Sequence, residues 1–207
     1  MKKQLGIIVI SLLSFSFIHA QDEPAEEVDR GFKKENLFTG GSVSVSFGNN
    51  TFLIGGTPVF GYSLTRWLDA GLSVNFNYTS YRDYLDFDDR LRQTVYGPGV
   101  FTRIYPVRFL FAHAQLEHNF INQKYLPPNN GPKESVTEEA TSFLVGAGYT
   151  TNRNPGSGQS FFYLSILVDL MDNEYSPYRD NANRILPIVR AGLQIPLFQN
   201  ADRYDRY

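Results

Sequence analysis

The sequence predicts an all-β fold, an eight-stranded antiparallel up-and-down transmembrane β-barrel with a packed polar lumen. The first observation is strict alternation in residues 69–79 (DAGLSVNFNYT), where polar or small side chains at odd positions separate apolar ones at even positions. This pattern gives a strand one polar and one apolar face. The second is that seven further segments alternate in the same way. The third is their length, because about 9–11 tilted residues cross the hydrocarbon core of a bilayer, whereas most soluble strands stop at roughly five or six.

The composition and the N-terminus favour an exported, strand-rich protein. The 207 residues include 13 Tyr, 17 Phe and 17 Gly, a mixture typical of strands and turns. Lys2 and Lys3, an apolar stretch over residues 5–18 and the small residue Ala20 predict a secretory signal peptide over residues 1–20. Residues 21–36 are interpreted as an acidic periplasmic linker, 37–198 as the barrel and 199–207 as a polar C-terminal tail.

Charge and cysteine content exclude several partners. The net charge of −2 gives no electrostatic reason to expect a nucleic-acid partner. The absence of cysteine excludes disulfides, thiolate metal sites and a lipid anchor on an N-terminal Cys.

Each predicted strand has an apolar face and a more polar face. In chain order the strands are residues 41–47, 52–64, 69–79, 94–105, 109–121, 142–149, 162–170 and 189–197. The apolar faces carry Val43 and Phe47; Ile54 and Phe60; Leu72, Val74 and Phe76; Tyr96 and Val100; Leu110 and Leu116; Phe143 and Val145; Leu164 and Ile166; and Val189 and Leu193. The opposite faces carry Ser42, Ser44 and Ser46; Thr57 and Ser63; Ser73, Asn75 and Asn77; Gly97 and Arg103; His113 and Glu117; Ser142 and Gly146; Ser165 and Asp169; and Arg190 and Gln194.

The connections alternate roughly between short and long, as the periplasmic turns and outer loops of outer-membrane barrels do. The predicted outer loops 81–93, 122–139 and 173–184 mix Tyr with charges of both signs, a composition that fits surface recognition and equally fits loops that are only wettable. Two connections depart from the pattern. The first outer loop is only Asn49-Asn50, and the turn at 152–160 is long for the periplasmic side.

A soluble β-sandwich is the main alternative, because it would bury the apolar faces against each other. The strand lengths, the alternating connections and the aromatic residues near the strand ends favour the membrane barrel. These aromatic residues are Tyr62, Tyr78, Tyr96, Phe120 and Tyr149.

The last strand adds a more specific resemblance. Arg190-Ala-Gly192-Leu-Gln-Ile195-Pro-Leu197, followed by Phe198, resembles the barrel-assembly signal of small eight-stranded outer-membrane β-barrel proteins of Gram-negative bacteria, the OmpA/OmpX-like barrel family. The resemblance covers residues 37–198, whereas the family signal usually ends the chain. It implies a location in the cell outer membrane, with outer-membrane lipid and, during insertion, the barrel-assembly machinery as partners.

An eight-stranded barrel is just wide enough for side chains to fill its interior. We therefore expect a lumen polar network of Arg103, His113, Gln115, Glu117, Asp169, Arg190 and Gln194. Counting from the short turns puts Glu117, Asp169 and Arg190 at similar heights. Because Asp169 and Arg190 lie on neighbouring strands, we expect them to pair, with Glu117 as a further partner, and we expect Arg103 near His113.

Catalysis and metal binding have little support in the sequence. His113 and His118 fall on opposite faces of a strand and cannot share a metal. No nucleophile is placed beside His118 by spacing. Asp86, Asp88 and Asp89 lack the glycine and distal Glu of an EF-hand loop, which favours a solvated acidic loop. We expect no enzyme activity and no cofactor.

The sequence therefore predicts a structural or surface-interaction role through the outer loops, without identifying the surface ligand. The alternatives are a narrow pore for ions or small solutes and a secreted soluble lipocalin-like binding barrel. The lipocalin-like barrel would place apolar residues inside and polar residues outside.

Overall fold

The computed structural model describes residues 31–48, 50–85, 87–128, 132, 134–151, 153–154, 158–173, 175–180 and 182–198. The predicted signal peptide, the linker up to residue 30 and the tail lie outside the described residues. Contacts divide the chain into Met1–Phe32 and Lys33–Tyr207, and every described strand belongs to the second unit. In the described ranges, no helix has the length and apolar character needed to cross a membrane.

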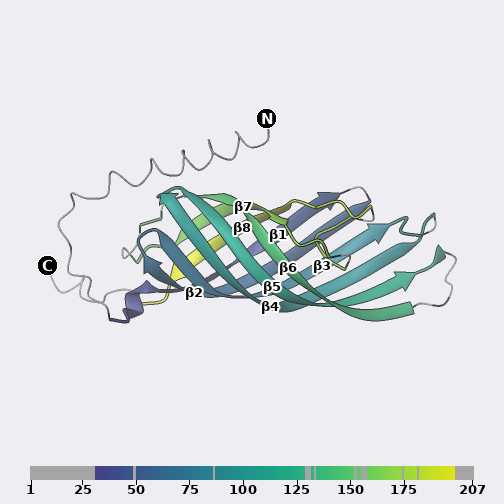
Figure 1. Cartoon of the computed structure of the whole chain (residues 1–207), viewed down its shortest axis with the longest axis horizontal. Coiled ribbons are helices and arrows are strands. Elements are labelled where there is room, and N and C mark those ends of the chain that lie inside the picture. Colours follow the sequence, from purple (N-terminus) through teal and green to yellow (C-terminus); the bar gives the residue numbers. More distant parts are fainter. Residues whose placement is uncertain are drawn as a thin grey trace, which may run out of the picture. The chain divides into compact units, whose positions relative to one another are not determined.

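Eight antiparallel strands form the barrel. Each strand pairs with the next along the chain, and β8 pairs with β1 to close the ring (Figure 1). A short 3-10 helix, η2 (Lys34–Asn36), leads into the first strand. The strands are β1 (Leu37–Gly48), β2 (Thr51–Thr65), β3 (Leu68–Arg82), β4 (Arg90–Val107), β5 (Leu110–Leu126), β6 (Glu134–Thr150), β7 (Phe161–Asp169) and β8 (Ile188–Pro196). The predicted fold class is confirmed.

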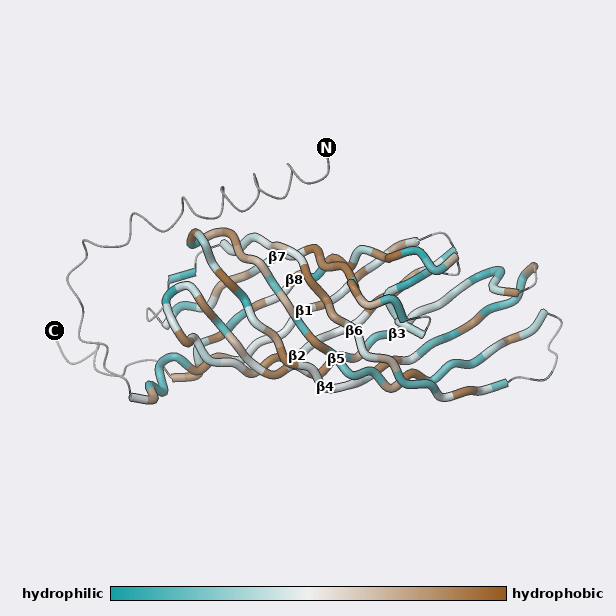
Figure 2. Tube along the Cα trace, viewed as in Figure 1, coloured by the Kyte–Doolittle hydropathy of each residue, from teal (hydrophilic) through white to brown (hydrophobic). Residues whose placement is uncertain are grey.

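The predicted faces of the strands are also confirmed. Along β3, Ser73, Asn75 and Asn77 are buried, whereas Leu72, Val74 and the apolar positions after them are exposed. The other strands repeat this arrangement, which Figure 2 shows as alternating hydrophobic and hydrophilic residues along the tube. A closed ring has no unpaired sheet edge, so its backbone groups are satisfied within the barrel.

The prediction of a long loop at 122–139 is wrong, because most of these residues belong to strands. β5 continues to Leu126 and β6 begins at Glu134, and the two pair as far as Tyr125 opposite Glu134. The segment has polar residues on both faces, so the alternation that marks a strand in lipid is lost. Together with β3 and β4, these strands extend beyond the end of β7, toward the right-hand side of Figure 1.

The two ends of the barrel differ in their connections. Arg66 and Trp67 join β2 to β3, and Arg108 and Phe109 join β4 to β5. The connections between β3 and β4 and between β7 and β8 lie at the opposite end and are longer. The connection between β6 and β7, from Thr150 to Phe161, is the one long connection at the end with the short turns. By the rule for outer-membrane barrels, this end is periplasmic and the other is the outer mouth.

Candidate functional site

The outside of the barrel is apolar around the ring. Exposed aliphatic and aromatic side chains come from all eight strands, including Val43, Phe60, Phe76, Val100, Leu116, Phe143, Ile166 and Val189. Soluble monomers rarely expose continuous apolar surface of this extent. The barrel spans a membrane. Because closed barrels of this kind are the architecture of bacterial outer membranes, this places the chain in the cell outer membrane.

Aromatic pairs lie toward both edges of this apolar surface. Tyr96 and Phe120 contact each other toward the outer side, with ring centroids 5.7 Å apart. Phe109 and Tyr149 lie 6.3 Å apart at the end with the short turns. Such positions match the interfacial girdles of membrane barrels. The lipocalin-like alternative is wrong, because the structure has its apolar faces outside and its polar faces inside.

Glu117 lies in the middle of the lumen and is 1% exposed. Its Oε2 accepts a hydrogen bond from the Tyr178 hydroxyl at 2.6 Å. Its Oε1 forms an ion pair with Arg190 Nη2 at 3.2 Å and accepts a hydrogen bond from Gln115 Nε2 at 2.6 Å. Arg190 Nη1 also donates to Gln115 Oε1 at 3.0 Å. A buried pair of this kind makes removal of either partner costly, because the other charge is left uncompensated.

Arg103 extends the network toward the periplasmic end. Its Nε donates to His113 Nδ1 at 3.2 Å, and its Nη1 donates to Gln194 Oε1 at 3.1 Å. The His113 ring therefore carries its proton on Nε2, which lies 3.0 Å from Gln115 Oε1 and donates to it. The Arg103 guanidinium carbon also lies 4.2 Å from the centre of the Tyr163 ring, a cation–π geometry.

The floor of the lumen is closed by Arg153, which the sequence analysis did not single out. Arg153 Nη2 pairs with Asp69 Oδ1 at 2.7 Å, and Nη1 donates to the Arg66 carbonyl at 2.5 Å. The guanidinium carbon lies 3.7 Å from the centre of the Tyr105 ring. Asp69 also accepts a hydrogen bond from Gln194 at 3.4 Å, which joins the floor to the network. The sequence feature that could have indicated this contact is the unusual length of the turn that carries Arg153.

Asp169 departs from its predicted place. Its Oδ2 accepts a hydrogen bond from the Ser176 hydroxyl at 2.6 Å, and its Oδ1 accepts from two backbone amides. The predicted pairing with Arg190 is wrong. Arg190 lies opposite Ser165 on β7, and Asp169 lies farther along that strand. The predicted position of Asp169 along the barrel axis was counted in residues from the turn before β7. Because that turn is long, the count places Asp169 too close to the level of Arg190.

The other predicted network residues are brought together in one connected chain of hydrogen bonds. From mouth to floor it runs through Tyr178, Glu117, Arg190, Gln115, His113, Arg103, Gln194, Asp69 and Arg153. Arg190 pairs with Glu117 and Arg153 pairs with Asp69, whereas Arg103 is held by His113, Gln194 and the Tyr163 ring. Above them, Tyr178 packs against buried Leu53, Leu144, Leu167 and Ile188. Side chains thus fill the described lumen.

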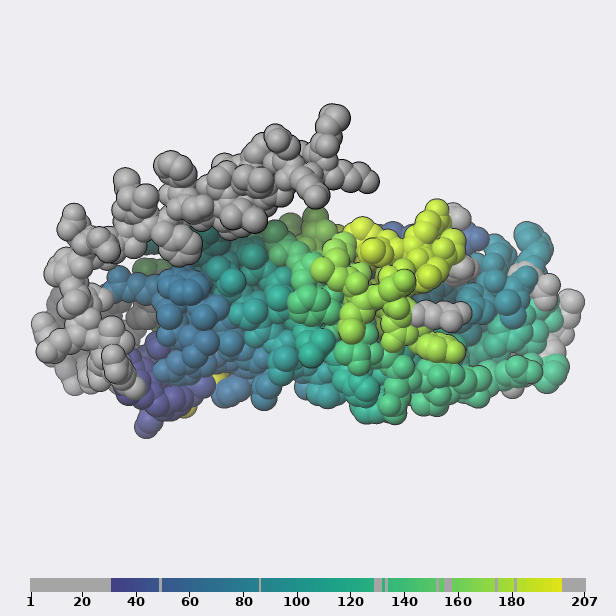
Figure 3. Space-filling view, in the orientation of Figure 1, coloured from purple at the N-terminus to yellow at the C-terminus, as the bar shows by residue number. Residues whose placement is uncertain are grey.

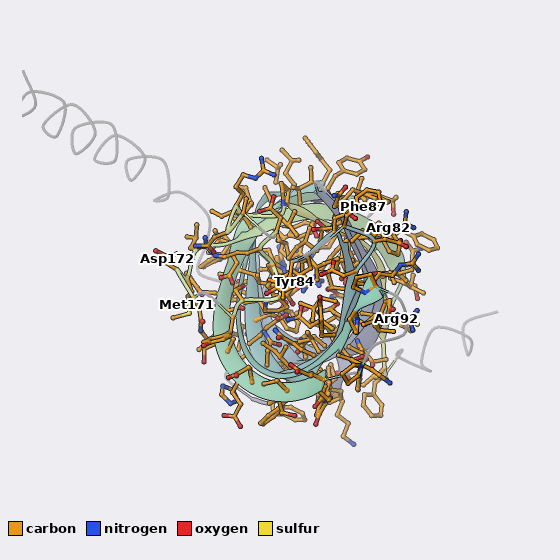
Figure 4. The ribbon with its side chains drawn as sticks, turned by 90° about the vertical axis from the view of Figure 1, so that its right-hand side faces the viewer. Arg82, Tyr84, Phe87, Arg92, Met171 and Asp172 are labelled. Carbon is orange, nitrogen blue, oxygen red and sulfur yellow. The ribbon has the colours of Figure 1, made fainter. Side chains whose placement is uncertain are left out.

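A pocket of about 430 Å³ opens at the outer mouth. It lies between β3–β5 on one side and the segment after β7 on the other. Figure 3 shows that this segment (yellow-green) ends short of the tips of the longer strands. Figure 4 views the mouth from outside, with Tyr84 near its middle, Asp172 on one side and Arg92 on the other. The aromatic lining is Tyr81, Tyr84 and Tyr175, and the amide lining is Gln93, Gln123 and Asn183.

The loop that carries Tyr84 is held by a buried carboxylate. Asp89 Oδ1 accepts the backbone N–H of Tyr84 at 2.5 Å, and Oδ2 accepts that of Leu85 at 2.8 Å. Asp83, with a positive φ of 51°, accepts the Asp88 backbone N–H and the Asn50 side-chain amide. The expectation of a simply solvated acidic loop is therefore wrong for Asp89, which is buried and organises the loop.

The segment between β7 and β8 is equally well tied. Tyr178 anchors it in the lumen, and a small hairpin pairs Arg179 with Ile185. At the hairpin turn, Asp180 forms an ion pair with Arg184 at 2.7 Å and accepts the backbone N–H groups of Ala182 and Arg184. Burial raises the pKa of the Asp180 carboxyl, but the hydrogen bonds from Arg184 and the backbone lower it more, so its pKa lies below the ordinary value.

The histidines lie on opposite faces, as predicted. His113 is in the lumen network, whereas His118 is on the outside, with its Nε2 3.6 Å from Glu139 Oε2. Across the described ranges, no group of three or more His, Cys, Asp or Glu residues is placed to hold a metal.

Comparison with solved structures finds similar barrels at low sequence identity. The N-terminal β-barrel domain of Pseudomonas aeruginosa OprF matches with a TM-score of 0.44 and 14% identity, over 78% of this chain and 97% of that one. Ail, the attachment invasion locus protein of Yersinia pestis, in complex with the heparin analogue sucrose octasulfate, matches with a TM-score of 0.48 and 11% identity, over 77% and 95%. Neisserial surface protein A matches with a TM-score of 0.38 and 12% identity, over 77% and 95%.

These neighbours are small outer-membrane barrels of Gram-negative bacteria. Their likeness to this chain concerns the fold. No protein-family model and no curated protein matches the sequence.

Proposed function

We propose that this protein is a closed outer-membrane barrel that binds a ligand from outside the cell in the pocket at its mouth. The observation that carries the proposal is the combination of a filled lumen with a preformed pocket directly above it. The same loop segment makes both, because Tyr178 points down to Glu117 while Tyr175, Arg179 and Asn183 line the pocket.

Order in the pocket walls favours binding over a merely wettable surface. A loop that is already fixed loses little conformational entropy when a ligand binds, and affinity rises accordingly. Asp89 fixes one wall, and the hairpin around Asp180 fixes the other. Tyrosine and arginine, both present in the lining, are enriched at recognition surfaces.

The pore alternative has less support. An ion moving through the barrel would have to displace the Glu117–Arg190 pair and the Asp69–Arg153 pair in succession. Water-filled channels are found in barrels of roughly 16–18 strands. We therefore propose a non-conducting protein whose lumen serves as a structural core. Insertion by the barrel-assembly machinery, with β8 as the recognised strand, belongs to the same proposal.

Binding to a mixed array tests the proposal. The purified barrel, labelled and held in lipid nanodiscs, is applied to immobilised oligosaccharides, peptides and lipid headgroups. We expect retention on at least one class, lost when residues 83–89 are replaced by a Gly/Ser linker of equal length. The lumen variant Ser165→Ala, which leaves the mouth unchanged, is the matched control and retains binding. No retention of the wild-type protein, or equal retention of the linker variant, would contradict the proposal.

A further inference from the structure

We propose that the mouth pocket binds a neutral saccharide of one or two sugar rings. This inference rests on the proposed function, because it names the ligand class of the same pocket. The volume of about 430 Å³ falls within the range of small-molecule sites.

The tyrosines supply apolar surfaces at an angle to each other. The rings of Tyr81 and Tyr84 have centroids 6.1 Å apart and an interplanar angle of 52°, so they form two sides of a corner. Tyr81 is buried, and its hydroxyl lies within hydrogen-bond distance of the Gln93 side-chain amide, at 3.3 Å, and of the Arg179 carbonyl, at 3.2 Å. Tyr84 is 39% exposed and presents ring surface to the opening. A pyranose ring has a face of C–H groups that packs on an aromatic ring, with hydroxyls around its rim.

The amides supply groups that suit those hydroxyls. An amide side chain both donates and accepts hydrogen bonds, as a hydroxyl does. Gln93 lines the pocket at 3% exposure, and its amide has one partner among the described residues, the Tyr81 hydroxyl, which leaves the other end of the amide for a ligand. The side-chain amide of Gln123 is unbonded among the described residues and reaches the same pocket. A buried amide directed into a cavity has a hydrogen-bonding requirement that a ligand hydroxyl can meet.

The charges in the lining are already neutralised. Arg179 pairs with Asp172 at 3.2 Å and donates to the carbonyls of Met171 and Asn183. Asp180, the other acidic residue in the lining, is paired with Arg184. Among the described residues, Arg179 is the only arginine in the lining, and its committed Nη atoms disfavour a phosphate, sulfate or carboxylate. Its buried Nε has no hydrogen-bond partner among these residues and can donate to a ligand hydroxyl. The acidic groups of the pocket are likewise held by arginines, which disfavours a cationic ligand.

Saturation-transfer NMR on the full-length barrel in nanodiscs tests the inference. The neutral probes are methyl glucoside, methyl galactoside, maltose, cellobiose and lactose, and the charged probes are glucuronate, glucose 6-phosphate and glucosamine. We expect at least one neutral probe to receive saturation at its ring C–H protons. The charged probes are expected to receive little.

Two pocket variants and one control complete the test. Tyr84→Ala and Gln123→Ala are expected to weaken binding about tenfold, the order of one aromatic or hydrogen-bonded contact. Tyr84→Phe, which keeps the ring, is expected to retain binding. Phe87→Ala removes an exposed ring from the same loop outside the pocket lining and should change nothing. A heat-modifiability gel shift verifies that each variant is folded.

The outcomes separate this inference from the proposed function. Binding of charged probes alone, or neutral binding that survives both Tyr84→Ala and Gln123→Ala, overturns the saccharide inference. Absence of any neutral binding overturns it too, while retention of peptides or lipid headgroups on the mixed array leaves the proposed function standing. If the array also shows no retention, both fail.

Discussion

Replacing Arg190 by Met should destabilise the barrel strongly. Arg190 and Glu117 are both almost fully buried, and the substitution removes the ion pair at 3.2 Å together with the hydrogen bond to Gln115. Glu117 keeps its hydrogen bonds from Tyr178 and Gln115, which carry no formal charge to balance it. Breaking a buried pair by removing one partner costs about 3–5 kcal/mol, and we expect a loss of unfolding free energy in that range.

The Arg190→Met/Glu117→Gln double variant separates two contributions to the lost stability, the unpaired buried charge and the changed side-chain packing. Replacing both charges removes the uncompensated carboxylate, so the double variant should recover about 2 kcal/mol relative to the sum of the single variants. Urea unfolding in lipid vesicles measures all three, with fluorescence from Trp67, the only tryptophan in the chain. A loss below about 1 kcal/mol for Arg190→Met, or strictly additive single variants, would refute the reasoning.

Three further predictions concern the lipid face, the floor and the outer loop. Val74→Arg on the apolar face should lower the free energy of unfolding by about 2–4 kcal/mol, measured by urea unfolding. Phe87→Arg, at an exposed loop position, should change it by less than about 0.5 kcal/mol. Equal effects of the two substitutions would contradict the assignment of Val74 to the lipid-facing surface. Arg153→Ala leaves its carboxylate partner in the floor unpaired and should cost about 3–5 kcal/mol in the same assay; an unchanged midpoint and slope would count against a closed floor. The pKa of Asp180 is lower in the folded protein than the ordinary aspartate pKa of about 3.9. Its carboxylate therefore stabilises the hairpin fully at pH values above about 3.9, and this stabilisation is lost as the pH falls through the pKa of the folded state. The NMR amide signal of Arg184 should titrate with a midpoint below about 3.9 and lose this step in Asp180→Asn, and a midpoint above that value would exclude the depressed pKa.

The sequence predicts the fold correctly where one face of a strand meets lipid and must be apolar while the other faces the lumen and is polar. Along β3, Asn75 and Asn77 face inward and Val74 and Phe76 face outward, as the alternation predicts. The prediction fails where that contrast ends. Residues 122–126 and 134–139 are paired strand, yet both of their faces meet water, so nothing in their polarity distinguishes them from a loop.

Long-range contacts in the lumen were predicted less well. Contact between Arg103 and His113 could be expected because they lie on adjacent strands, where they are direct register partners. The predicted contact of Arg190 with Glu117 is confirmed, whereas the predicted contact with Asp169 is wrong, because contacts across the lumen depend on the shear of the closed ring. Two contacts arise from connections that fold inward, Arg153 to Asp69 and Tyr178 to Glu117. Alternation carries no information about such connections.

The mouth pocket was predicted only in outline. Tyrosines and charges in the outer loops fitted surface recognition, but the sequence did not show which of them converge. Asp89 illustrates the reason: it has the composition of a solvated loop, yet its carboxylate turns inward to hold two backbone amides. Convergence of Tyr84, Gln93 and Arg179 depends on how the two loops fold against each other.

Single-channel recording in planar lipid bilayers tests the central claim most directly, that the barrel is closed and acts at its mouth. The claim depends on a lumen filled from Tyr178 to Arg153 and crossed by two buried ion pairs. For the wild-type protein, inserted and verified as folded by its gel shift, the account predicts no conductance steps above the bare bilayer. Discrete, reproducible steps that scale with salt concentration would contradict it, because they require a continuous aqueous path through the network.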